Sequence, residues 1–407
     1  MFESSSIIVG LEIGTSKVCA VVGELNANHS LNIIGLGQSK SRGVRKGEIS
    51  NAAAAAEDIR NAIVEAEQMA DVEIRSVFLG VTGAHVSGFH NRGVHTVVSA
   101  DREITPEDVE DVIKNAKAVN VSADNYIIHA VRQHFLVDGQ EGVASPVGMV
   151  GSRLEVDMHI IHGVFNRLQN PVRAVKGLQL EVDAIVYNGL ASSLAVLSRE
   201  QKEMGTLVID MGGGTTDYVV YHGGIIRHTG VLSVGGDHVS NDLAFGLKVP
   251  LGRAEELKIK HGSALWNEAE NRQTIASHQQ RGFPSRSINL GHLRRIMSLR
   301  LEETFQLIAE DIAGSGLLNY LSGGIVLCGG GSRIPDITTL TERIFRVPVS
   351  VGRTHSISGL KSALDQPEFS TGIGLVRFGT FQQKKRPGGK LFSGGFRLPF
   401  GNLFKRR

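Results

Sequence analysis

The chain has 407 residues, of which 41% are hydrophobic and 21% charged, and its formal charge is +2. The length suggests about two to four domain-sized units, and the small net charge gives no general attraction to nucleic acid, so no nucleic-acid partner is expected. No apolar run approaches the roughly 20 residues that cross a bilayer, and the N-terminus lacks the basic region of a signal peptide. Two cysteines in apolar runs, Cys19 and Cys328, indicate buried thiols. We therefore expect a globular body in the cytoplasm.

The first segment of the sequence predicts a β-hairpin. Two apolar runs, SIIVGLEIG and KVCAVVGEL, are joined by Gly, Thr and Ser at residues 14–16, which suit a tight turn with exposed backbone. A third strand is expected at residues 31–35 and a helix at residues 52–70, where apolar residues recur on one face. A further apolar strand, within IRSVFLGVTGAHV, ends at Gly83.

Residues 84–163 differ in character and predict a small α+β unit inserted into the first half. A helix is expected to begin after Thr105, with Pro106 at its first position and Asp108 at the spacing of a capping box. Strand-like text follows, first YIIHAVRQHFLVDG and then SPVGMVGSRLEVDMHIIHG.

The second half begins at Thr206 and repeats the start of the first. When Glu12 is aligned with Asp210, VGLEIGTS lies on LVIDMGGG, and both copies continue into a second apolar strand. An internal repeat indicates duplicated structural units. Two such halves, each opening with a strand, a turn and a strand, can face each other across a cleft.

The rest of the sequence predicts mainly helices. Helical text is found around AEELKIKHGSAL and over residues 290–320, whereas the polar stretch 267–287 predicts a loop or a small subdomain. GGIVLCGGGSRIPDI predicts a strand, a glycine turn and the start of a helix. A basic linker at residues 381–395 leads to the last stretch, FRLPFGNLFKRR at residues 396–407.

Three glycine turns carry the chemistry of a phosphate site. Phosphate needs several converging backbone N–H donors with no side chain in the way, and Gly212, Gly213 and Gly214 can provide them. Asp210, at the end of the preceding strand, can hold Mg²⁺ through water. One such turn alone is more often structural, but three turns after apolar strands, two with acids at matched positions, favour a ligand site. The sequence has no GxxxxGK[ST] loop and no good dinucleotide fingerprint.

Taken together, these motifs resemble the actin-like ATPase superfamily. VGLEIGTSKVCAVVGEL is similar to its first phosphate motif, LVIDMGGGTTDYVVY to the second, GIVLCGGGSRIPDI to the adenosine motif and AIVYNGLASSLAVL to the helix that connects the halves. Within this superfamily the sequence resembles the FtsA family of bacterial cell-division proteins through SRGVRKGEIS, ITPEDV, IIHAVRQHFLVDG and PVGMVGSRLE. The last three stretches lie within residues 84–163, and the resemblance covers essentially the whole chain.

The resemblance implies an α/β, actin-like two-lobed fold with duplicated ATPase halves, an inserted subdomain of the FtsA type called 1C, and a flexible amphipathic tail at the C-terminus. It assigns residues 1–83 and 164–205 to subdomain 1A, 84–163 to 1C, 206–235 and 308–380 to 2A, 236–307 to 2B, 381–395 to a linker and 396–407 to a membrane-targeting segment.

The resemblance also implies a site for ATP and Mg²⁺ between the halves. Asp210 and Glu12 would lie near the metal. The three glycine turns and the helix that contacts the ribose and base would supply the nucleotide contacts: Gly14, Thr15, Ser16, Lys17, Gly212, Gly213, Gly214, Thr215, Glu255, Lys258, Gly329, Gly330, Ser332 and Arg333. From the residues alone, Glu255 and Lys258 are better explained as an exposed charge pair on a helix.

Slow turnover of ATP is expected from one missing acid. Hydrolysis needs a group that orients or deprotonates the attacking water. In kinases and MreB an acid stands at the start of the connecting helix, whereas here Asn188 is nearest and no carboxylate occurs before Glu200. Asparagine can position water but cannot act as a base. Most of the superfamily has an aspartate where this sequence has the longer Glu12, which shifts the metal geometry. We therefore predict tight binding with at most slow ATPase activity and assign no catalytic residue.

The last residues predict a membrane-binding segment. After Pro399, apolar residues recur at helical spacing between basic residues, so the apolar face can enter the membrane interface while the cations contact anionic lipid. The predicted membrane contacts are Phe396, Arg397, Phe400, Leu403, Phe404, Lys405, Arg406 and Arg407. One tail would bind weakly, and many tails on one polymer firmly. Composition alone is equally compatible with a disordered basic tail.

The resemblance further implies the partners. FtsA-like proteins tether the FtsZ filament to the cytoplasmic face of the inner membrane at the division septum, polymerise head to tail and recruit later division proteins. The FtsZ C-terminal tail binds subdomain 2B, where HLRRIMSLR offers Arg294, Arg295 and Arg300 as part of the dock. A solvated helix face is an equal alternative for these arginines. An FtsA-like scaffold of pilus assembly and a small-molecule kinase of the same fold stay open as rival functions.

Overall fold

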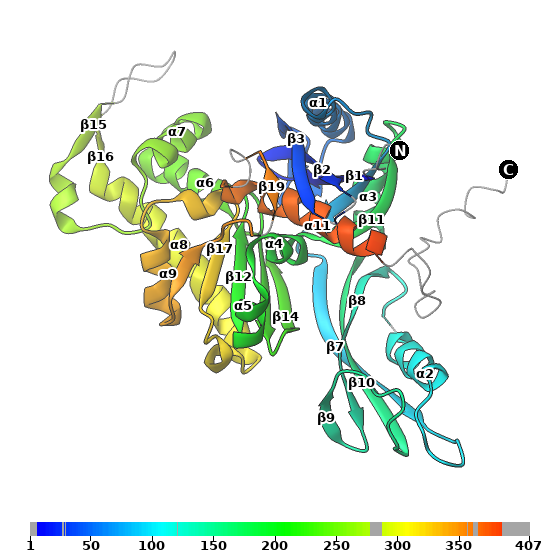
Figure 1. The fold of residues 1–407 in the computed structure, drawn as a ribbon. Helices are drawn as coiled ribbons and strands as arrows, with labels where there is room; N and C mark the ends of the chain where they lie inside the picture. The colour runs from blue at the N-terminus through cyan, green and yellow to red at the C-terminus, as the bar shows by residue number, and fades with distance from the viewer. Residues whose placement is uncertain are drawn as a thin grey trace.

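A computed structural model describes residues 6–26, 28, 30–119, 121–276, 287–355, 357–360 and 365–384. Figure 1 shows two lobes side by side, with a smaller α/β unit extending from one of them. The predicted two-lobed fold with duplicated halves is confirmed by this arrangement, and Cys19 and Cys328 are buried free thiols. The predicted tail at residues 396–407, with all its proposed membrane contacts, lies outside the described residues, as does the linker beyond residue 384.

The first half is built on a six-stranded sheet in the order β11-β6-β1-β2-β3-β19. Strands β1 and β2 form the central antiparallel hairpin, and β6 lies parallel to β1. The hairpin is buried along most of its length, which explains why its sequence is a continuous apolar run without alternation. The strand bounds are β1 (Ser6–Ile13), β2 (Lys17–Leu25), β3 (Leu31–Lys40), β6 (Ser76–Val81), β11 (Glu181–Tyr187) and β19 (Ser358–Gly359).

The second half repeats this topology in a five-stranded sheet ordered β14-β13-β12-β17-β18. Its hairpin β12–β13 is antiparallel and β17 lies parallel to β12, as β6 does to β1. The internal repeat found in the sequence therefore corresponds to the same hairpin in two equivalent sheets. The bounds are β12 (Thr206–Met211), β13 (Thr216–His222), β14 (Ile225–Leu232), β17 (Ile325–Cys328) and β18 (Val349–Val351).

Helices pack around and between the two sheets. Helix α1 (Ala52–Ala70) has the predicted bounds because the Asn51 side chain caps it by accepting from the Ala54 N–H, and the chain leaves it at Asp71 in the left-handed conformation. Helices α4 (Asn188–Val196) and α11 (Ser370–Lys384) pack on each other at the joint between the lobes (Figure 1). Helices α3 (Phe165–Lys176) and α5 (Arg199–Met204) and strands β4 (Val44–Arg45) and β5 (Glu48–Ile49) complete the first lobe and the joint.

The second lobe carries a group of helices beyond its sheet. They and the short elements between them are α6 (Gly236–Leu247), α7 (Leu251–His261), η1 (Glu268–Arg272), β15 (Thr274–Ala276), β16 (Ser287–Asn289), α8 (Leu290–Gly314), η2 (Leu318–Tyr320), η3 (Gly330–Arg333), α9 (Ile337–Phe345) and η4 (Pro367–Phe369). Two expectations need adjustment. The helix expected over 290–320 ends at Gly314, and the turn after β17 forms a short 3₁₀ turn before α9. Pro335 disfavours helix in the residue before it, and Asp336 is left-handed, with φ 63°.

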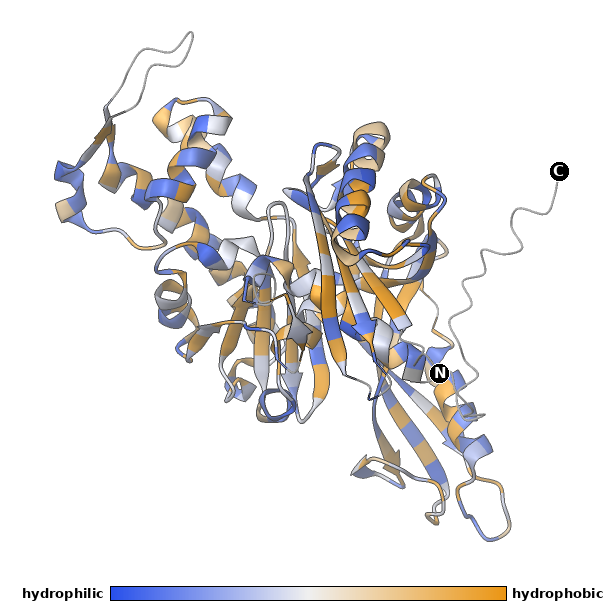
Figure 2. Cartoon of the chain, turned by 45° about the horizontal axis from the view of Figure 1, so that its top comes forward, coloured by the Kyte–Doolittle hydropathy of each residue, from blue (hydrophilic) through white to orange (hydrophobic). Residues whose placement is uncertain are grey.

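The inserted unit is a four-stranded sheet, β7-β10-β8-β9, with helix α2 against one face. Its strands show alternating hydrophobic and hydrophilic bands in Figure 2, as expected when one face packs and the other meets water. The predicted capping box is present, because Thr105 and Asp108 each accept a hydrogen bond from the other's backbone N–H. The bounds are β7 (Val86–Thr96), α2 (Pro106–Lys117), β8 (Asn125–Val137), β9 (Gln140–Val143) and β10 (Arg153–Val164).

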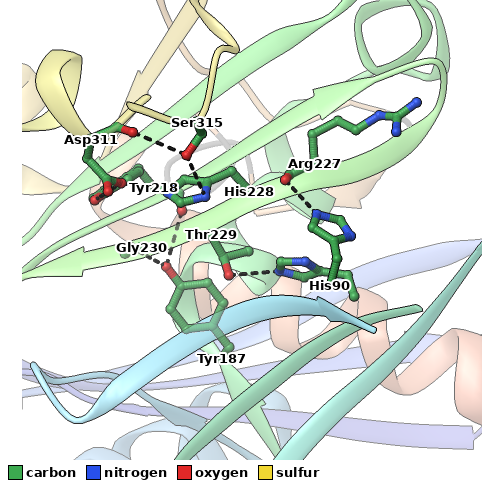
Figure 3. Close-up of polar contacts among 10 residues, drawn as sticks. His90, Tyr187, Tyr218, Arg227, His228, Thr229, Gly230, Asp311 and Ser315 are labelled. Atoms are coloured by element: carbon green, nitrogen blue, oxygen red, sulfur yellow. Dashed lines mark hydrogen bonds and ion pairs between the residues drawn. The ribbon is translucent and has the colours of Figure 1, made fainter. Parts of the chain in front are cut away.

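The inserted unit also touches strand β14 of the second half, a contact that we call the insert seam (Figure 3). His90 donates to a β14 carbonyl at 2.8 Å, and Nε2 of His159 lies 2.9 Å from the hydroxyl of Thr229. At the end of β11, the Tyr187 hydroxyl donates to the Gly230 carbonyl at 2.7 Å. Burial lowers the pKa of His159 to about 3, so this imidazole is neutral at physiological pH. The seam connects the two lobes independently of the helices at the joint.

Among the described helices, none is both long enough and apolar enough to span a membrane.

Candidate nucleotide site

The turns of the two central hairpins lie against each other. In each, the first glycine donates its N–H to a carbonyl three residues later: Gly14 to Lys17 at 3.0 Å, and Gly212 to Thr215 at 2.9 Å. A Cβ atom on Gly214 would clash with the Thr15 hydroxyl. Glycine is therefore required here by the close approach of the two turns, and the predicted pairing of the first two phosphate motifs is seen as a direct contact.

Backbone donors at this contact are unpaired. At this contact, the described structure has no protein acceptor for the N–H groups of Thr15, Ser16, Gly213, Gly214 and Thr215. The carbonyls beside them are used, because the N–H groups of residues 236 and 237 donate to Gly212 and Gly213 at 3.0 and 2.8 Å. Backbone N–H groups rarely stay without an acceptor, and several of them exposed in adjoining turns form a concavity for an anion. The chain of negative oxygens in a polyphosphate suits this cradle.

Three carboxyl groups lie beside the cradle, two of them buried (Asp210 and Asp217) and one partly buried (Glu12). Burial raises the pKa of Glu12 and of Asp210, and it raises the pKa of Asp217 well above its ordinary value. The negative charge of Asp210 adds to the increase at both other acids. Lys17 is the nearby cation, with its ammonium 3.6 Å from Glu12. Such a cluster favours binding of a further cation, because an added positive charge lowers the cost of ionising the acids.

Neighbouring hydroxyls orient two of these acids. One oxygen of Asp210 accepts hydrogen bonds from Ser192 and from Thr371, the latter at 2.8 Å. Both oxygens of Asp217 accept from Thr82, at 2.7 and 2.9 Å. Within the described residues no three His, Cys, Asp or Glu side chains are arranged as a metal cage. Mg²⁺ is usually held by one or two carboxylates together with water and substrate phosphates.

The third glycine turn lies against Asp210 and the end of β12. Gly329 has a φ of 77°, and a Cβ atom there would lie 2.6 Å from the Met211 carbonyl and would clash with Asp210. Nothing lies within 4 Å of the corresponding position on Gly330, so its backbone faces open space. The side chains of Ser332 and Arg333 are engaged in the protein. Ser332 donates to the Gly329 carbonyl at 2.7 Å, and Arg333 pairs with Glu368 at 2.8 Å.

Glu255 and Lys258 form an ion pair of 2.7 Å on α7, but the pair is more than a surface feature. The Lys258 side chain is only 11% exposed, and its ammonium donates to the Gly236 carbonyl at 3.1 Å. Since the Gly236 N–H in turn donates to Gly212, this lysine is two hydrogen bonds from the cradle. Lys258 is therefore not an exposed residue, whereas the Glu255 side chain is 43% exposed, as the alternative of an exposed pair expects.

Asn188 is the first residue of α4 and is buried. Its side-chain oxygen has no hydrogen-bond partner in the described structure, and a Cβ atom on Gly80 would lie 2.5 Å from that oxygen. The helix between the lobes thus begins with an amide that has a free acceptor and no acid.

Sequence reasoning assigned no role to Asp217 or Thr82. The signal for Asp217 was present, because a four-residue turn places it directly opposite Asp210 in the β12–β13 ladder. Thr82 carried no comparable signal, since it follows β6 in the other lobe and meets Asp217 only through the fold. Glu368 and Phe369 were also missed: the Lys17 ammonium donates to the Glu368 carbonyl at 2.7 Å and lies 5.1 Å from the Phe369 ring centroid.

The three arginines of the predicted dock all lie on α8, but two of them have acid partners. Arg294 pairs with Glu270, and Arg300 pairs with Asp242 at 2.5 Å and also with Glu303. Arg295 is exposed and lies 5.1 Å from the Trp266 ring centroid. The basic character of this face is reduced by these pairs, and its docking role stays a prediction.

Two equivalent α/β halves meeting at paired hairpin turns define the class of actin-like folds. The MreB5 protein of Spiroplasma citri bound to ADP superimposes with a TM-score of 0.55 at 16% identity, covering 94% of this chain and 99% of that chain. The PilM–PilN type IV pilus biogenesis complex gives 0.64 at 16% identity, covering 92% and 98%. These similarities show the fold.

The sequence comparisons are more specific. The family model described as cell division protein FtsA matches residues 207–374, and that of the SHS2 domain inserted in FtsA matches residues 83–162. The cell division protein FtsA of Pseudomonas aeruginosa is 39% identical over 381 residues, covering 94% of this chain and 91% of the relative. That of Borreliella burgdorferi is 42% identical over 382 residues, covering 94% and 92%. The chain belongs to the FtsA family of cell-division proteins.

Proposed function

We propose that this chain binds ATP with Mg²⁺ between its two lobes and acts as a membrane tether for the division filament. The observation that carries the nucleotide part is the set of unpaired N–H groups at the contact of the two hairpin turns, beside three acids whose pKa values are raised by burial. A fold neighbour, the MreB5 protein of Spiroplasma citri, was solved with ADP bound. Nucleotide binding is thus compatible with this architecture.

In this proposal, different groups at the site have different chemical roles. Backbone N–H groups of residues 15–16 and 213–215 would hold the phosphate oxygens, and Lys17 would add a positive charge. Asp210, with Glu12, would hold Mg²⁺ through water, and the ion would neutralise phosphate charge. The open backbone at Gly330 leaves room for the adenosine beside the third turn.

Slow hydrolysis follows from the residue at the start of α4. Asn188 can form a hydrogen bond with water but cannot remove its proton, and two of the nearby acids, Asp210 and Asp217, are already hydrogen-bonded to hydroxyls. We infer that nucleotide binding sets the relative position of the lobes and that turnover serves, at most, to reset it slowly.

At the level of the cell, we infer the role of the FtsA family. The chain would polymerise head to tail, attach to anionic lipid through residues 396–407, and bind the FtsZ C-terminal tail through subdomain 2B, at the cytoplasmic face of the inner membrane at the septum. Later division proteins would then be recruited. The subdomain limits given above are part of this proposal. The PilM–PilN complex shows that a protein of this fold can serve pilus biogenesis, and this is the alternative function.

One co-sedimentation experiment with lipid, ATP and FtsZ tests the proposal. Full-length protein should pellet with anionic vesicles and carry FtsZ into the pellet, and a chain lacking residues 396–407 should leave both in solution. Calorimetry with ATP and Mg²⁺ provides the second readout, for which Asp210→Asn should weaken the Mg²⁺ dependence. Pelleting of FtsZ without vesicle binding, or ATP affinity independent of Mg²⁺ and of Asp210, would contradict the proposal. Phosphoryl transfer to a sugar or similar hydroxyl compound would favour the kinase alternative.

A further inference from the structure

The β4–β5 hairpin, in the stretch SRGVRKGEIS, has an unfavourable turn. Arg45 pairs with Glu48 across the hairpin, so only two residues form the turn. These are Lys46 and Gly47, with φ angles of 51° and 77°. Two positive φ angles suit asparagine followed by glycine, and a lysine is unfavourable at the first of the two positions. Residues that their surroundings hold in such a conformation cluster at functional sites, so the contacts of this turn are informative.

The turn packs directly on the cradle. The Gly47 N–H donates to the Thr15 hydroxyl at 3.0 Å. A Cβ atom on Gly214 would lie 2.9 Å from both the nitrogen and the Cα atom of Lys46. Thr15 and Gly214 are two of the residues whose N–H groups lack an acceptor where the two central hairpins meet. The backbone of Lys46 is therefore next to the donors that would hold phosphate.

The Lys46 side chain is exposed and has no acid partner among the described residues. Glu48, the acid of the same hairpin, pairs instead with Arg167 of α3 at 2.7 Å. Burial lowers the pKa of His238, and the charge of Lys46 contributes to this decrease. His238 lies in the first turn of α6, next to the N–H groups of residues 236 and 237 that donate to the β12–β13 turn. An unpaired cation on a flexible four-carbon stem thus stands at the edge of the cradle.

The contacts of the β12–β13 turn indicate which phosphate Lys46 would meet. Just before the turn, a Cβ atom on Gly331 of the third glycine turn would lie 2.5 Å from Cγ of Met211. The Gly212 carbonyl then accepts from α6 at 3.0 Å, and Gly214 lies against Lys46. The proposed adenosine position is beside the third glycine turn, so the phosphate chain would run from there along the β12–β13 turn. The phosphate farthest from the adenosine would then be the one at Gly214 and Lys46.

We propose that Lys46 binds the terminal phosphate of ATP and that this contact makes the chain bind ATP more tightly than ADP. The inference rests on the nucleotide site proposed above. An ammonium group forms strong charge-assisted hydrogen bonds to phosphate oxygens, and ADP lacks the phosphate that Lys46 would reach. Asparagine would suit the turn better but is too short to extend to that phosphate, which gives the unfavourable lysine a chemical reason.

Calorimetry on the full-length chain tests the proposal, with ATP and ADP as separate ligands and Mg²⁺ present in both titrations. The variants are Lys46→Gln, Lys46→Asn and Lys46→Arg. Lys248→Gln is the matched control, because Lys248 is also exposed and left-handed, with φ 53°, but lies at the far end of α6.

Lys46→Gln and Lys46→Asn should each raise the Kd of ATP at least about tenfold, or about 1.4 kcal/mol, while the Kd of ADP changes by less than about twofold. Lys46→Arg should keep the preference for ATP, and Lys248→Gln should change neither Kd. Retained ADP binding shows that a variant is folded. Urea denaturation of Lys46→Asn adds a second check, because asparagine suits the turn and this variant should be no less stable than the unsubstituted chain.

Two results would overturn the role of Lys46 and leave the nucleotide site standing. In one, Lys46→Gln weakens ATP and ADP binding by the same factor, so the lysine does not distinguish the terminal phosphate. In the other, Lys46→Gln and Lys46→Asn bind both nucleotides as the unsubstituted chain does. If the unsubstituted chain binds neither nucleotide, the proposed site itself is wrong and the inference about Lys46 is refuted with it.

Discussion

The buried histidine of the insert seam should make stability fall in mild acid. His159 is 1% exposed and its pKa is lowered to about 3, against about 6.5 in an unfolded chain. Between these two values the unfolded chain binds a proton that the folded chain does not bind. The free energy of unfolding therefore decreases as the pH falls through this window, starting near pH 6.5.

The expected size follows from the same two pKa values. From pH 7 to pH 5 the unfolded imidazole becomes almost fully protonated while the folded one stays neutral, which lowers the free energy of unfolding by about 2 kcal/mol. His129, which is 7% exposed and also has a pKa lowered to about 3, adds about the same amount. The acids Glu12, Asp210 and Asp217 act in the opposite direction, because their folded pKa values are raised.

A substitution separates the contribution of His159 to the pH dependence of stability from the contributions of the other titrating groups. His159→Gln cannot titrate but can still hydrogen-bond Thr229, so its loss of stability between pH 7 and pH 5 should be smaller than that of the unsubstituted chain by about 2 kcal/mol. Urea denaturation at both pH values gives these free energies. His292→Gln is the control, since His292 is exposed. An equal pH dependence in the His159→Gln variant and the unsubstituted chain would refute the argument.

Three further substitutions test the fold and the site. Gly214→Ala places a Cβ atom against Thr15 and 2.9 Å from Lys46 Cα, so ATP affinity measured by calorimetry should fall at least about tenfold. Gly252→Ala is the control and should not change the affinity, because nothing lies within 4 Å of a Cβ atom there. Equal ATP affinities of the two variants would argue against the cradle. Thr105→Ala removes the cap of α2 and should lower the free energy of unfolding of the inserted unit by about 1 kcal/mol, with Thr105→Ser retaining it. Tyr187→Phe deletes a buried hydroxyl that donates to Gly230, and urea denaturation should show a loss of about 1–2 kcal/mol; an unchanged midpoint would mean that the seam contributes no stability through this bond.

Local signals in the sequence were sufficient to predict several helices and strands of the fold. The bounds of α1 and the capping box of α2 depend on residues within one helical turn, Asn51 in the first case and Thr105 with Asp108 in the second. The duplicated hairpins were also recognisable, because buried strands on both sides of a glycine turn produce the same short pattern twice. In each of these features, the residues that determine the structure lie within a few positions of the element that they determine.

Features that depend on tertiary contacts were not predictable in this way. Thr82 meets Asp217 across the lobes, and Lys17 is held by the carbonyl of Glu368 at the other end of the chain. The pairing of Arg300 with Asp242 on α6 was equally impossible to predict from the sequence. The run of arginines was therefore proposed as a basic face, with a solvated helix face as the equal alternative, although Asp242 neutralises part of its charge. Periodicity reports which face of an element is buried and carries no information on which distant side chain it will meet.

The position of α11 has a mechanical consequence. Its first turn contains Thr371, which donates to the buried carboxylate of Asp210, and the helix then runs over 15 residues to Lys384, where the described chain ends. A helix of about 22 Å therefore connects the Asp210 end of the candidate site to Lys384. Tension applied to the chain beyond Lys384 would be transmitted along the helix to the Asp210 hydrogen bond with little loss in flexible loops. A pulling force on the tail and the occupancy of the site should consequently influence each other.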